Sequence, residues 1–228
     1  ELREAPISKG NKDTYNDYIQ YKEQNSAMRK AKKIIKDFNG DTHKTVLFLS
    51  YKAENWNTMD NIYKKYCQEK DIKVIVQCVP YYYKNIDGTF EKYIDGGMYP
   101  EYVTITPIED YNYVNENPDV IVFQYPYDNY NSAGTTDPVF YSYNLASHTQ
   151  KLIYIPYFRT DEIDENDMRA YTNMDAYVTM PGVVYADKVI VQSEEIRKLY
   201  IKKLTDFFGE ESEDEWEDKI EAEDIGGI

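Results

Sequence analysis

Five short apolar segments recur along the chain, and they constrain its fold more than any other feature. They are Lys44–Tyr51, Ile72–Pro80, Asp119–Gln124, Lys151–Pro156 and Lys188–Gln192. Each has the length of a strand and is almost continuously apolar, which is typical of strands covered on both faces in a parallel sheet. A further short strand is expected at Tyr102–Thr106.

Stretches with helical spacing lie between these segments. After the first strand, Met59, Ile62, Tyr63 and Tyr66 recur at helical spacing, and Asn57 or Thr58 can cap the helix. Further helical stretches are expected at 108–115, 138–147, 166–184 and 194–208. Strands that alternate with helices form βαβ units with right-handed crossovers. We therefore expect an α/β fold, a Rossmann-like three-layer αβα domain with a mostly parallel sheet of about five or six strands.

Two terminal segments flank this domain, which is expected to span residues 41–208. Residues 1–40 are predicted to form an N-terminal helical extension, since 13–38 have the spacing of an amphipathic helix and Asn39-Gly40 ends it. Residues 209–228 contain ten Asp or Glu and one Lys. This acidic C-terminal segment is expected to be a solvated tail or an exposed helix around Trp216, and an acidic interaction tail is the alternative.

Charge and composition exclude several classes of protein. The formal net charge of −15 argues against nucleic acid as a partner. No apolar run reaches the length of a transmembrane helix, and the N-terminus lacks the pattern of a signal peptide. The two cysteines have no metal-site or disulfide-framework spacing, so a reducing, cytoplasmic location is expected. The chain begins without Met, which indicates a processed or excised fragment.

No signature of a cofactor or metal site is present. The sequence has neither GxGxxG nor GxxxxGK[ST], so neither NAD nor ATP is expected as a cofactor. Asp161–Asp167 holds five acids but lacks the spacing of a calcium loop, and it is interpreted as a helix start. His43 is expected to be exposed, and His148 is expected to end a helix as a cation.

Aromatic residues follow four of the five predicted strands. Ligands of open parallel sheets bind beyond the carboxyl ends of the strands, so these residues are expected to converge on one cleft. A tyrosine ring can stack on a sugar while its hydroxyl makes hydrogen bonds, and Lys52, Lys84 and Arg159 can supply charge for an anion. The candidate substrate-binding residues are Tyr51, Lys52, Trp56, Tyr81, Tyr82, Gln124, Tyr125, Tyr127, Tyr130, Tyr157, Arg159, Ser193 and Glu194.

Each of these assignments has a structural alternative. The chain contains 25 Tyr, so the aromatic strand ends can equally be ordinary packing. Asp128 is the candidate catalytic base, with stabilisation of its own loop as the alternative. Ser193 begins the last helix, where it can help to hold an anion or simply cap the helix.

Five segments together carry a resemblance to a known family. They are Lys44–Ala53 with Trp56, Val79–Gly88, Asn117–Asn131, Leu152–Phe158 and Ala186–Glu194. These segments resemble bacterial CDP-glycerol glycerophosphotransferase-like proteins and, more broadly, the N-terminal domain of a GT-B-fold glycosyltransferase. The resemblance covers residues from about 26 to about 208. In GT-B enzymes the N-terminal domain usually holds the acceptor and the C-terminal domain the nucleotide-activated donor.

The resemblance implies the acceptor-side half of a cytoplasmic glycosyl or glycerophosphate transferase that acts in cell-surface polymer synthesis, of teichoic acid or a capsular glycan. It implies a glycan or phosphopolyol acceptor and a C-terminal donor-binding domain that this sequence does not contain. Lys52 and Arg159 would then meet acceptor phosphate. The competing hypothesis is a non-catalytic Rossmann-like module that binds a ligand or a protein, and a flavodoxin-like nucleotide-binding domain is disfavoured because no phosphate loop is present.

Overall fold

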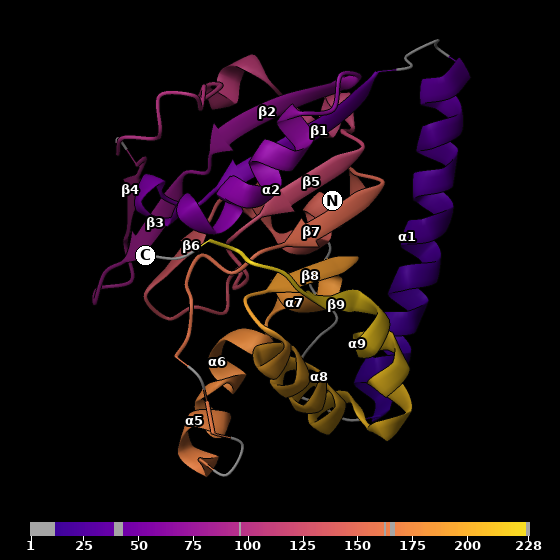
Figure 1. Cartoon of the computed structure of the whole chain (residues 1–228), viewed down its shortest axis with the longest axis vertical. Coiled ribbons are helices and arrows are strands. Elements are labelled where there is room, and N and C mark those ends of the chain that lie inside the picture. The colour runs from indigo at the N-terminus through magenta and orange to yellow at the C-terminus, as the bar shows by residue number, and fades with distance from the viewer. Residues whose placement is uncertain (1–11, 39–42, 96, 162, 165–166, 227–228) are drawn as a thin grey trace.

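A computed structural model describes residues 12–38, 43–95, 97–161, 163–164 and 167–226. In this part of the chain, six parallel strands form the main sheet in the order β2–β1–β5–β7–β8–β9 (Figure 1). Their bounds are β1 Lys44–Ser50, β2 Ile72–Cys78, β5 Val120–Phe123, β7 Lys151–Tyr154, β8 Lys188–Val191 and β9 Ile220–Ala222. The five strands predicted from apolar runs are all present.

The sixth predicted strand is reduced to a single contact. Ile105 forms an isolated parallel bridge with Val76, on the side of β2 that faces away from β1. With this contact counted as a rudimentary strand, the strand order is that of a doubly wound Rossmann sheet. The order in which strands are added reverses between β1 and β5.

Helices connect the strands. Their bounds are α1 Lys12–Phe38, α2 Asn57–Cys67, α3 Tyr113–Glu116, α4 Ser142–Ser147, α5 Met168–Asn173, α6 Asp175–Val178, α7 Pro181–Tyr185, α8 Glu194–Phe208 and α9 Glu213–Lys219, with short 3₁₀ helices at η1 Ala53–Asn55, η2 Ile108–Asp110, η3 Pro138–Phe140 and η4 Glu210–Ser212. The single helical stretch expected over 166–184 is three short helices, and Pro181 starts the last of them because proline suits the first turn of a helix.

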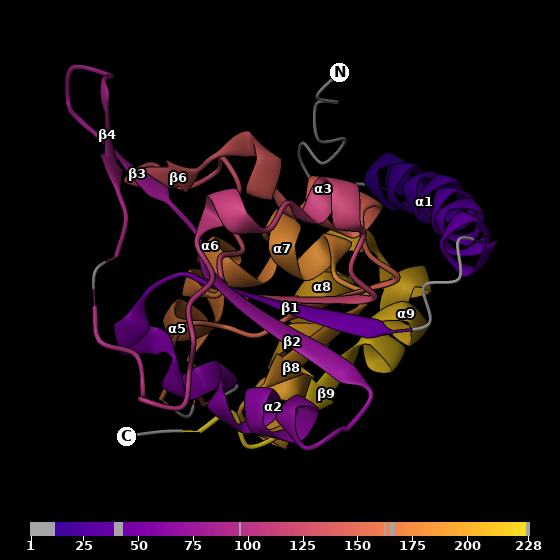
Figure 2. The ribbon, with the colours of Figure 1, turned by 90° about the horizontal axis from the view of Figure 1, so that it is seen from above.

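The two faces of the sheet carry separate cores. On β1, Leu47 and Leu49 face one core and Val46 and Phe48 the other, as the alternation of a strand requires. Residues of α4, α7 and α8 pack in the first core, and residues of α2 in the second, so the sheet lies between helical layers (Figure 2). The predicted three-layer α/β fold is therefore confirmed.

The N-terminal helix packs on this domain through one part of its length. Tyr18 of α1 is buried, and Asn25 is buried against the end of α4. Towards the end of α1, in contrast, Ile34, Ile35 and Phe38 are exposed. Figure 1 shows α1 standing beside the amino ends of the main strands.

A small antiparallel sheet replaces the loops that the sequence predicted after β2 and β5. It has the order β4–β3–β6, with β3 Tyr81–Lys84, β4 Phe90–Tyr93 and β6 Gly134–Thr136. The turn between β3 and β4 uses Gly88 at a φ of 83°. Gly134 lies so close to β3 that a Cβ there would be 2.8 Å from the Tyr82 carbonyl oxygen. These short strands lack the apolar runs of the main strands, so the sequence predicted loops at these positions.

The acidic C-terminal segment was expected to be a solvated tail or an exposed helix, and this prediction is wrong because the segment packs on the domain. Strand β9 pairs with β8 at the edge of the main sheet, and Trp216, Ile220 and Ile225 are buried. Four acids of α9, namely Glu213, Asp214, Glu217 and Asp218, are exposed, whereas Glu215 lies on the side of Trp216 and Lys219 and accepts a hydrogen bond from Tyr18. The charge count concealed this amphipathic pattern.

Contacts between α1 and α9 join the two ends of the chain. The Tyr18 hydroxyl donates to Glu215 Oε1 at 2.8 Å, and Lys219 Nζ donates to the Tyr18 oxygen and to the Val184 carbonyl, both at 2.7 Å. Complete burial lowers the pKa of Lys219 to about 7. The Tyr18 ring also lies 5.5 Å from the Trp216 ring, centroid to centroid.

We predict that Trp216→Ala lowers the free energy of unfolding by about 3–5 kcal/mol, because it empties a fully buried site. Asp218→Ala is the control, since this exposed residue is on the same helix and should change the free energy by less than about 0.5 kcal/mol. Urea unfolding followed by circular dichroism measures both. Equal, small effects of the two substitutions would show that the segment is not part of the cooperative fold.

Candidate functional site

Five tyrosines meet at the carboxyl edge of the main sheet, and we call Tyr51, Tyr81, Tyr125, Tyr127 and Tyr157 the tyrosine cluster. The Tyr51 ring is central, with centroid distances of 4.9 Å to Tyr81, 5.1 Å to Tyr125 and 5.1 Å to Tyr157. Tyr127 lies 5.1 Å from Tyr125. These residues follow β1, β2, β5 and β7, so the predicted convergence of strand ends is observed.

Gln124 fixes the position of the cluster between β1 and β5, where the strand order of the sheet reverses. Its side chain is buried between the ends of β1 and β5, where Oε1 accepts from the Tyr51 backbone N–H at 3.0 Å. Nε2 donates to the Asn55 carbonyl and to Thr58 Oγ1, both at 2.9 Å. Gln124 therefore holds the loop after β1 and has no exposed group for a ligand.

The cluster contains protonated hydroxyls and the cation of Lys52, although the Tyr125 hydroxyl already donates to the Gly134 carbonyl at 3.1 Å. Burial raises the pKa of Tyr51, Tyr125 and Tyr127 above its ordinary value, so these hydroxyls stay protonated at neutral pH. The Tyr127 and Tyr157 hydroxyl oxygens are 3.3 Å apart. Lys52 Nζ lies 5.4 Å from the ring centroids of both Tyr51 and Tyr81, within cation–π distance.

The cluster forms an open surface rather than an enclosed pocket. Tyr81 and Tyr125 are buried, and Tyr51, Tyr127 and Tyr157 are half-buried. A cavity lined by residues that include Tyr51, Tyr125 and Phe140 has a volume of only about 10 Å³. A neighbouring cavity of about 200 Å³, also lined by Phe140, is bordered by Tyr82 and Lys92.

Two predicted aromatic site residues lie away from the cluster centre. Trp56 is buried in the other core, 6.3 Å from the Phe48 ring and 5.1 Å from the Tyr63 ring, so its prediction as a cleft residue is wrong. Trp56 directly precedes α2, and its side chain packs with Met59, Ile62 and Tyr63 of that helix. Tyr130 is exposed on the loop after β5.

Three polar site candidates have structural partners. Arg159 donates to the Gly226 carbonyl at 2.7 Å and so holds the C-terminal segment. Ser193 Oγ accepts from the Ile196 N–H at 3.2 Å, which is the capping alternative. Glu194 forms an ion pair with Arg197 at 2.9 Å and is exposed.

Asp128 is not placed to act as a base on a surface ligand. It is 2% exposed, and its carboxylate accepts from the Ser142 N–H at 2.9 Å and from Ser142 Oγ at 2.8 Å. Its backbone is left-handed, with φ at 49°. Burial raises the pKa of Asp128 to about 7, although the bonds from Ser142 oppose the shift. Asp128 thus joins its loop to the start of α4, as the structural alternative stated.

The two histidines and the acidic cluster Asp161–Asp167 agree with their predictions in part. His148 follows α4, with Nδ1 2.9 Å from the Asn144 carbonyl oxygen, and burial lowers the pKa of its imidazole, which disfavours the expected cation. His43 is exposed as expected. Asp167 caps α5, in agreement with a helix start, while residues 162, 165 and 166 of the acidic cluster lie outside the described residues.

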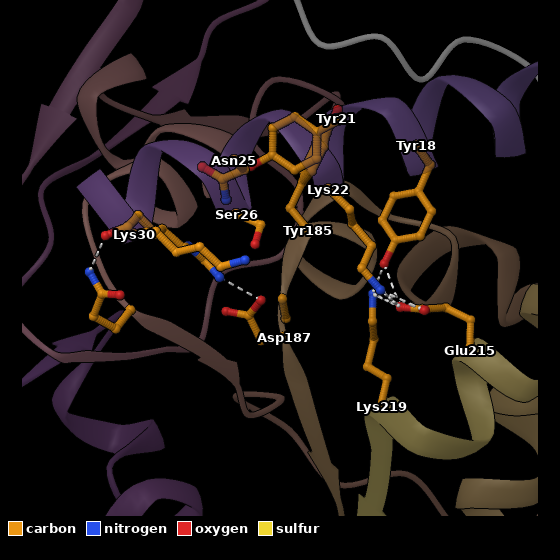
Figure 3. A pocket seen from close by; sticks show the side chains of 13 residues that line it. Tyr18, Tyr21, Lys22, Asn25, Ser26, Lys30, Tyr185, Asp187, Glu215 and Lys219 are labelled. Carbon is orange, nitrogen blue, oxygen red and sulfur yellow. Dashed lines mark hydrogen bonds and ion pairs between the residues drawn. The ribbon is translucent and has the colours of Figure 1, made fainter. Parts of the chain in front are cut away.

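A third cavity, of about 360 Å³, lies at the opposite edge of the sheet, beside α1 (Figure 3). Its walls come from α1, from the residues just before β7 and β8, and from α9, so no single sequence motif marks it. Within the described ranges, no group of three or more His, Cys, Asp or Glu side chains could hold a metal ion. Within the same ranges, no helix combines the length and apolar character needed to cross a bilayer.

Comparison with known proteins gives no family. No protein-family model matches the sequence, and no curated protein does. The chain has a weak structural similarity to the pyridoxal kinase from Staphylococcus aureus in complex with AMP-PCP and pyridoxal, with 14% sequence identity and a TM-score of 0.30. The alignment covers 74% of this chain and 60% of the kinase, and a similarity at this level carries no argument about function.

The raised pKa of Asp128 predicts a pH-dependent stability. The folded state keeps a proton on Asp128 up to about pH 7, whereas an ordinary carboxyl loses it near pH 3.8, so the wild-type free energy of unfolding should fall as pH rises between these values. Asp128→Asn should remove this fall. Relative to wild type, its stability should therefore rise by about 3 kcal/mol from pH 4 to pH 8.

Urea unfolding across this pH range provides the measurement, with Asp218→Asn as the exposed control. Parallel pH profiles for wild type and Asp128→Asn would mean that Asp128 is ionised in the folded protein.

Proposed function

We propose that this chain is the acceptor-binding part of a cytoplasmic transferase that extends a cell-surface polymer, and that a glycan or phosphopolyol acceptor lies across the tyrosine cluster. One observation carries the proposal. Tyrosines that follow four different strands converge near the point where the strand order reverses, between β1 and β5. Doubly wound folds bind ligands at this point. The resemblance of these strand-end segments to glycerophosphotransferase-like proteins motivates the substrate class.

The chemistry of the cluster suits an acceptor that combines hydroxyl and phosphate groups. Half-buried rings at Tyr51 and Tyr157 offer flat surfaces for a sugar or polyol chain, and protonated hydroxyls can donate to its oxygens. The ion-pair partner of Lys52 is Glu54, at 3.4 Å, and the Glu54 side chain is 72% exposed. This weak pair leaves Lys52 available for a phosphate. An exposed ion pair of this kind exchanges partners at little cost.

The openness of the cluster favours an extended acceptor over a small, enclosed one. A cavity of about 10 Å³ cannot surround a metabolite, but an open aromatic surface can support several units of a polymer. The adjoining cavity of about 200 Å³, beside Tyr82 and Lys92, has room for one terminal unit. Such a surface fits one wall of a cleft whose other wall belongs to a donor-binding domain.

No acid or base is assigned within this proposal. Asp128 is engaged with Ser142, and His148, which follows α4, has its Nδ1 2.9 Å from the Asn144 carbonyl oxygen. The described residues therefore contribute binding and orientation of the acceptor, and the reacting groups are left to the donor side.

A second candidate function, a non-catalytic module that binds a protein, is favoured by the β3–β4 hairpin. Ile86, Phe90, Tyr93 and Ile94 are exposed on this hairpin, which projects from the body of the domain in Figure 2. Exposed apolar groups gathered on one element are typical of an interaction surface.

We predict that Lys52→Ala weakens binding of a synthetic glycerol phosphate oligomer about tenfold, because it removes a charge-assisted hydrogen bond to a phosphate. Lys70→Ala is the matched control, since Lys70 is exposed just before β2 begins, at the other edge of the sheet. Isothermal titration calorimetry of wild type and both variants measures the affinities. Equal affinities in all three would reject the tyrosine cluster as the acceptor site.

A further inference from the structure

The cavity beside α1 is built at the edge of the sheet that the proposed function does not use. Gln150 and Asp187, which directly precede β7 and β8, form one wall, so the cavity lies at the amino ends of the strands. Residues of α1 and α9 form the other walls (Figure 3). Its volume of about 360 Å³ lies within the range of small-molecule sites.

Two side chains on α1 keep unused hydrogen-bonding capacity at this cavity. Asn25 is 6% exposed and donates from Nδ2 to the Ala146 carbonyl at 3.1 Å, while its Oδ1 has no partner among the described residues. Arg29 donates from Nε to the same carbonyl and from Nη1 to Asp187 at 2.7 Å, while its buried Nη2 has no partner there. Buried polar atoms without partners are rare in folded proteins, and each needs an explanation.

The charges around the cavity are unequal. Its lining includes the cations Lys22, Arg29 and Lys30 but only two acids, Asp187 and Glu215, in a chain whose net charge is −15. The fourth basic residue, Lys219, adds less charge because burial lowers its pKa to about 7. Glu215 already binds Lys22 at 2.6 Å, and Asp187 binds Arg29. Lys30 is exposed and has no ion-pair partner in the described part of the chain. The cavity is thus a local surplus of positive charge on an acidic protein.

We propose that this cavity is a second ligand site, which binds a small phosphomonoester with a hydroxyl group, such as a polyol phosphate. Arg29 Nη2 and Lys30 Nζ bind the phosphate, because an anion satisfies both the unpartnered donor and the surplus charge. Asn25 Oδ1 accepts from the ligand's hydroxyl group. The site is separate from the tyrosine cluster and does not depend on its function.

In this proposal a ligand enters by displacing exposed side chains that line the cavity. Asn25 Oδ1 and Arg29 Nη2 are shielded from solvent in this conformation. Lys30 and Ser26, which line the cavity, are both exposed. Exposed side chains change rotamer within nanoseconds, so a ligand can displace them without unfolding α1.

Calorimetry with three probes tests the proposal on the whole chain. Wild type should bind glycerol 3-phosphate more tightly than inorganic phosphate, and glycerol alone should not bind. Lys30→Ala should weaken glycerol 3-phosphate binding about tenfold. Lys33→Ala, an exposed residue of the same helix outside the cavity lining, is the matched control and should bind as wild type does.

A second variant tests the hydroxyl contact. Asn25→Leu should reduce the affinity for glycerol 3-phosphate about fivefold and leave inorganic phosphate unchanged, because only the hydroxyl group meets Oδ1. Lys52→Ala should leave glycerol 3-phosphate binding at this cavity intact, which separates it from the tyrosine cluster.

Three results would overturn the proposal. They are the absence of glycerol 3-phosphate binding to wild type, equal effects of Lys30→Ala and Lys33→Ala, and loss of binding in Lys52→Ala alone.

Discussion

The parallel pairing of β1 with both β2 and β5 is the constraint from which the remaining architecture follows. Strand β1 is buried on both faces, so helical layers must cover it on each side. The connection after β1 leads to α2 on one face of the sheet, and the connection after β5 leads to α4 on the other face. Gln124 joins β5 to the loop after β1 with three hydrogen bonds, and Tyr51 lies beside Tyr125. The candidate site is a direct consequence of this strand order.

The opposite edge of the sheet depends on contacts between the two ends of the described chain. Tyr18 of α1 packs on Trp216 of α9 and joins Glu215 and Lys219 through hydrogen bonds. These contacts fix β9 beside β8 and also form the walls of the cavity at α1. The contacts that stabilise this edge therefore also shape the second proposed site.

The sequence predicted the parts of the fold that carry a strong local signal, either a continuous apolar run or a helix cap. The apolar runs located β1, β2, β5, β7 and β8, and the cap at Ser193 located the start of α8. It failed for β9, because ten acids masked the inward-facing Trp216 and Ile220. It also failed for the β3–β4–β6 sheet, whose strands lack the continuous apolar run of the main strands.

The candidate site was predicted in part for a similar reason. Position at a strand end correctly brought Tyr51, Tyr125 and Tyr157 together, since parallel strands end at one edge. Position alone could not show that Trp56 turns under α2 or that Asp128 is buried against Ser142, because both depend on contacts distant in sequence. Nor could it find Asn25 and Arg29, whose unpartnered atoms are defined only by the packing of α1.

The most direct test of the central claim, that the tyrosine cluster is the acceptor surface, is an NMR titration of ¹³C-tyrosine-labelled protein with a glycerol phosphate oligomer too large for the cavity beside α1. The account predicts shifts of the ring resonances of Tyr51, Tyr127 and Tyr157. Shifts confined to Tyr18, Tyr21 and Tyr185, which line the cavity at the other edge, would contradict it.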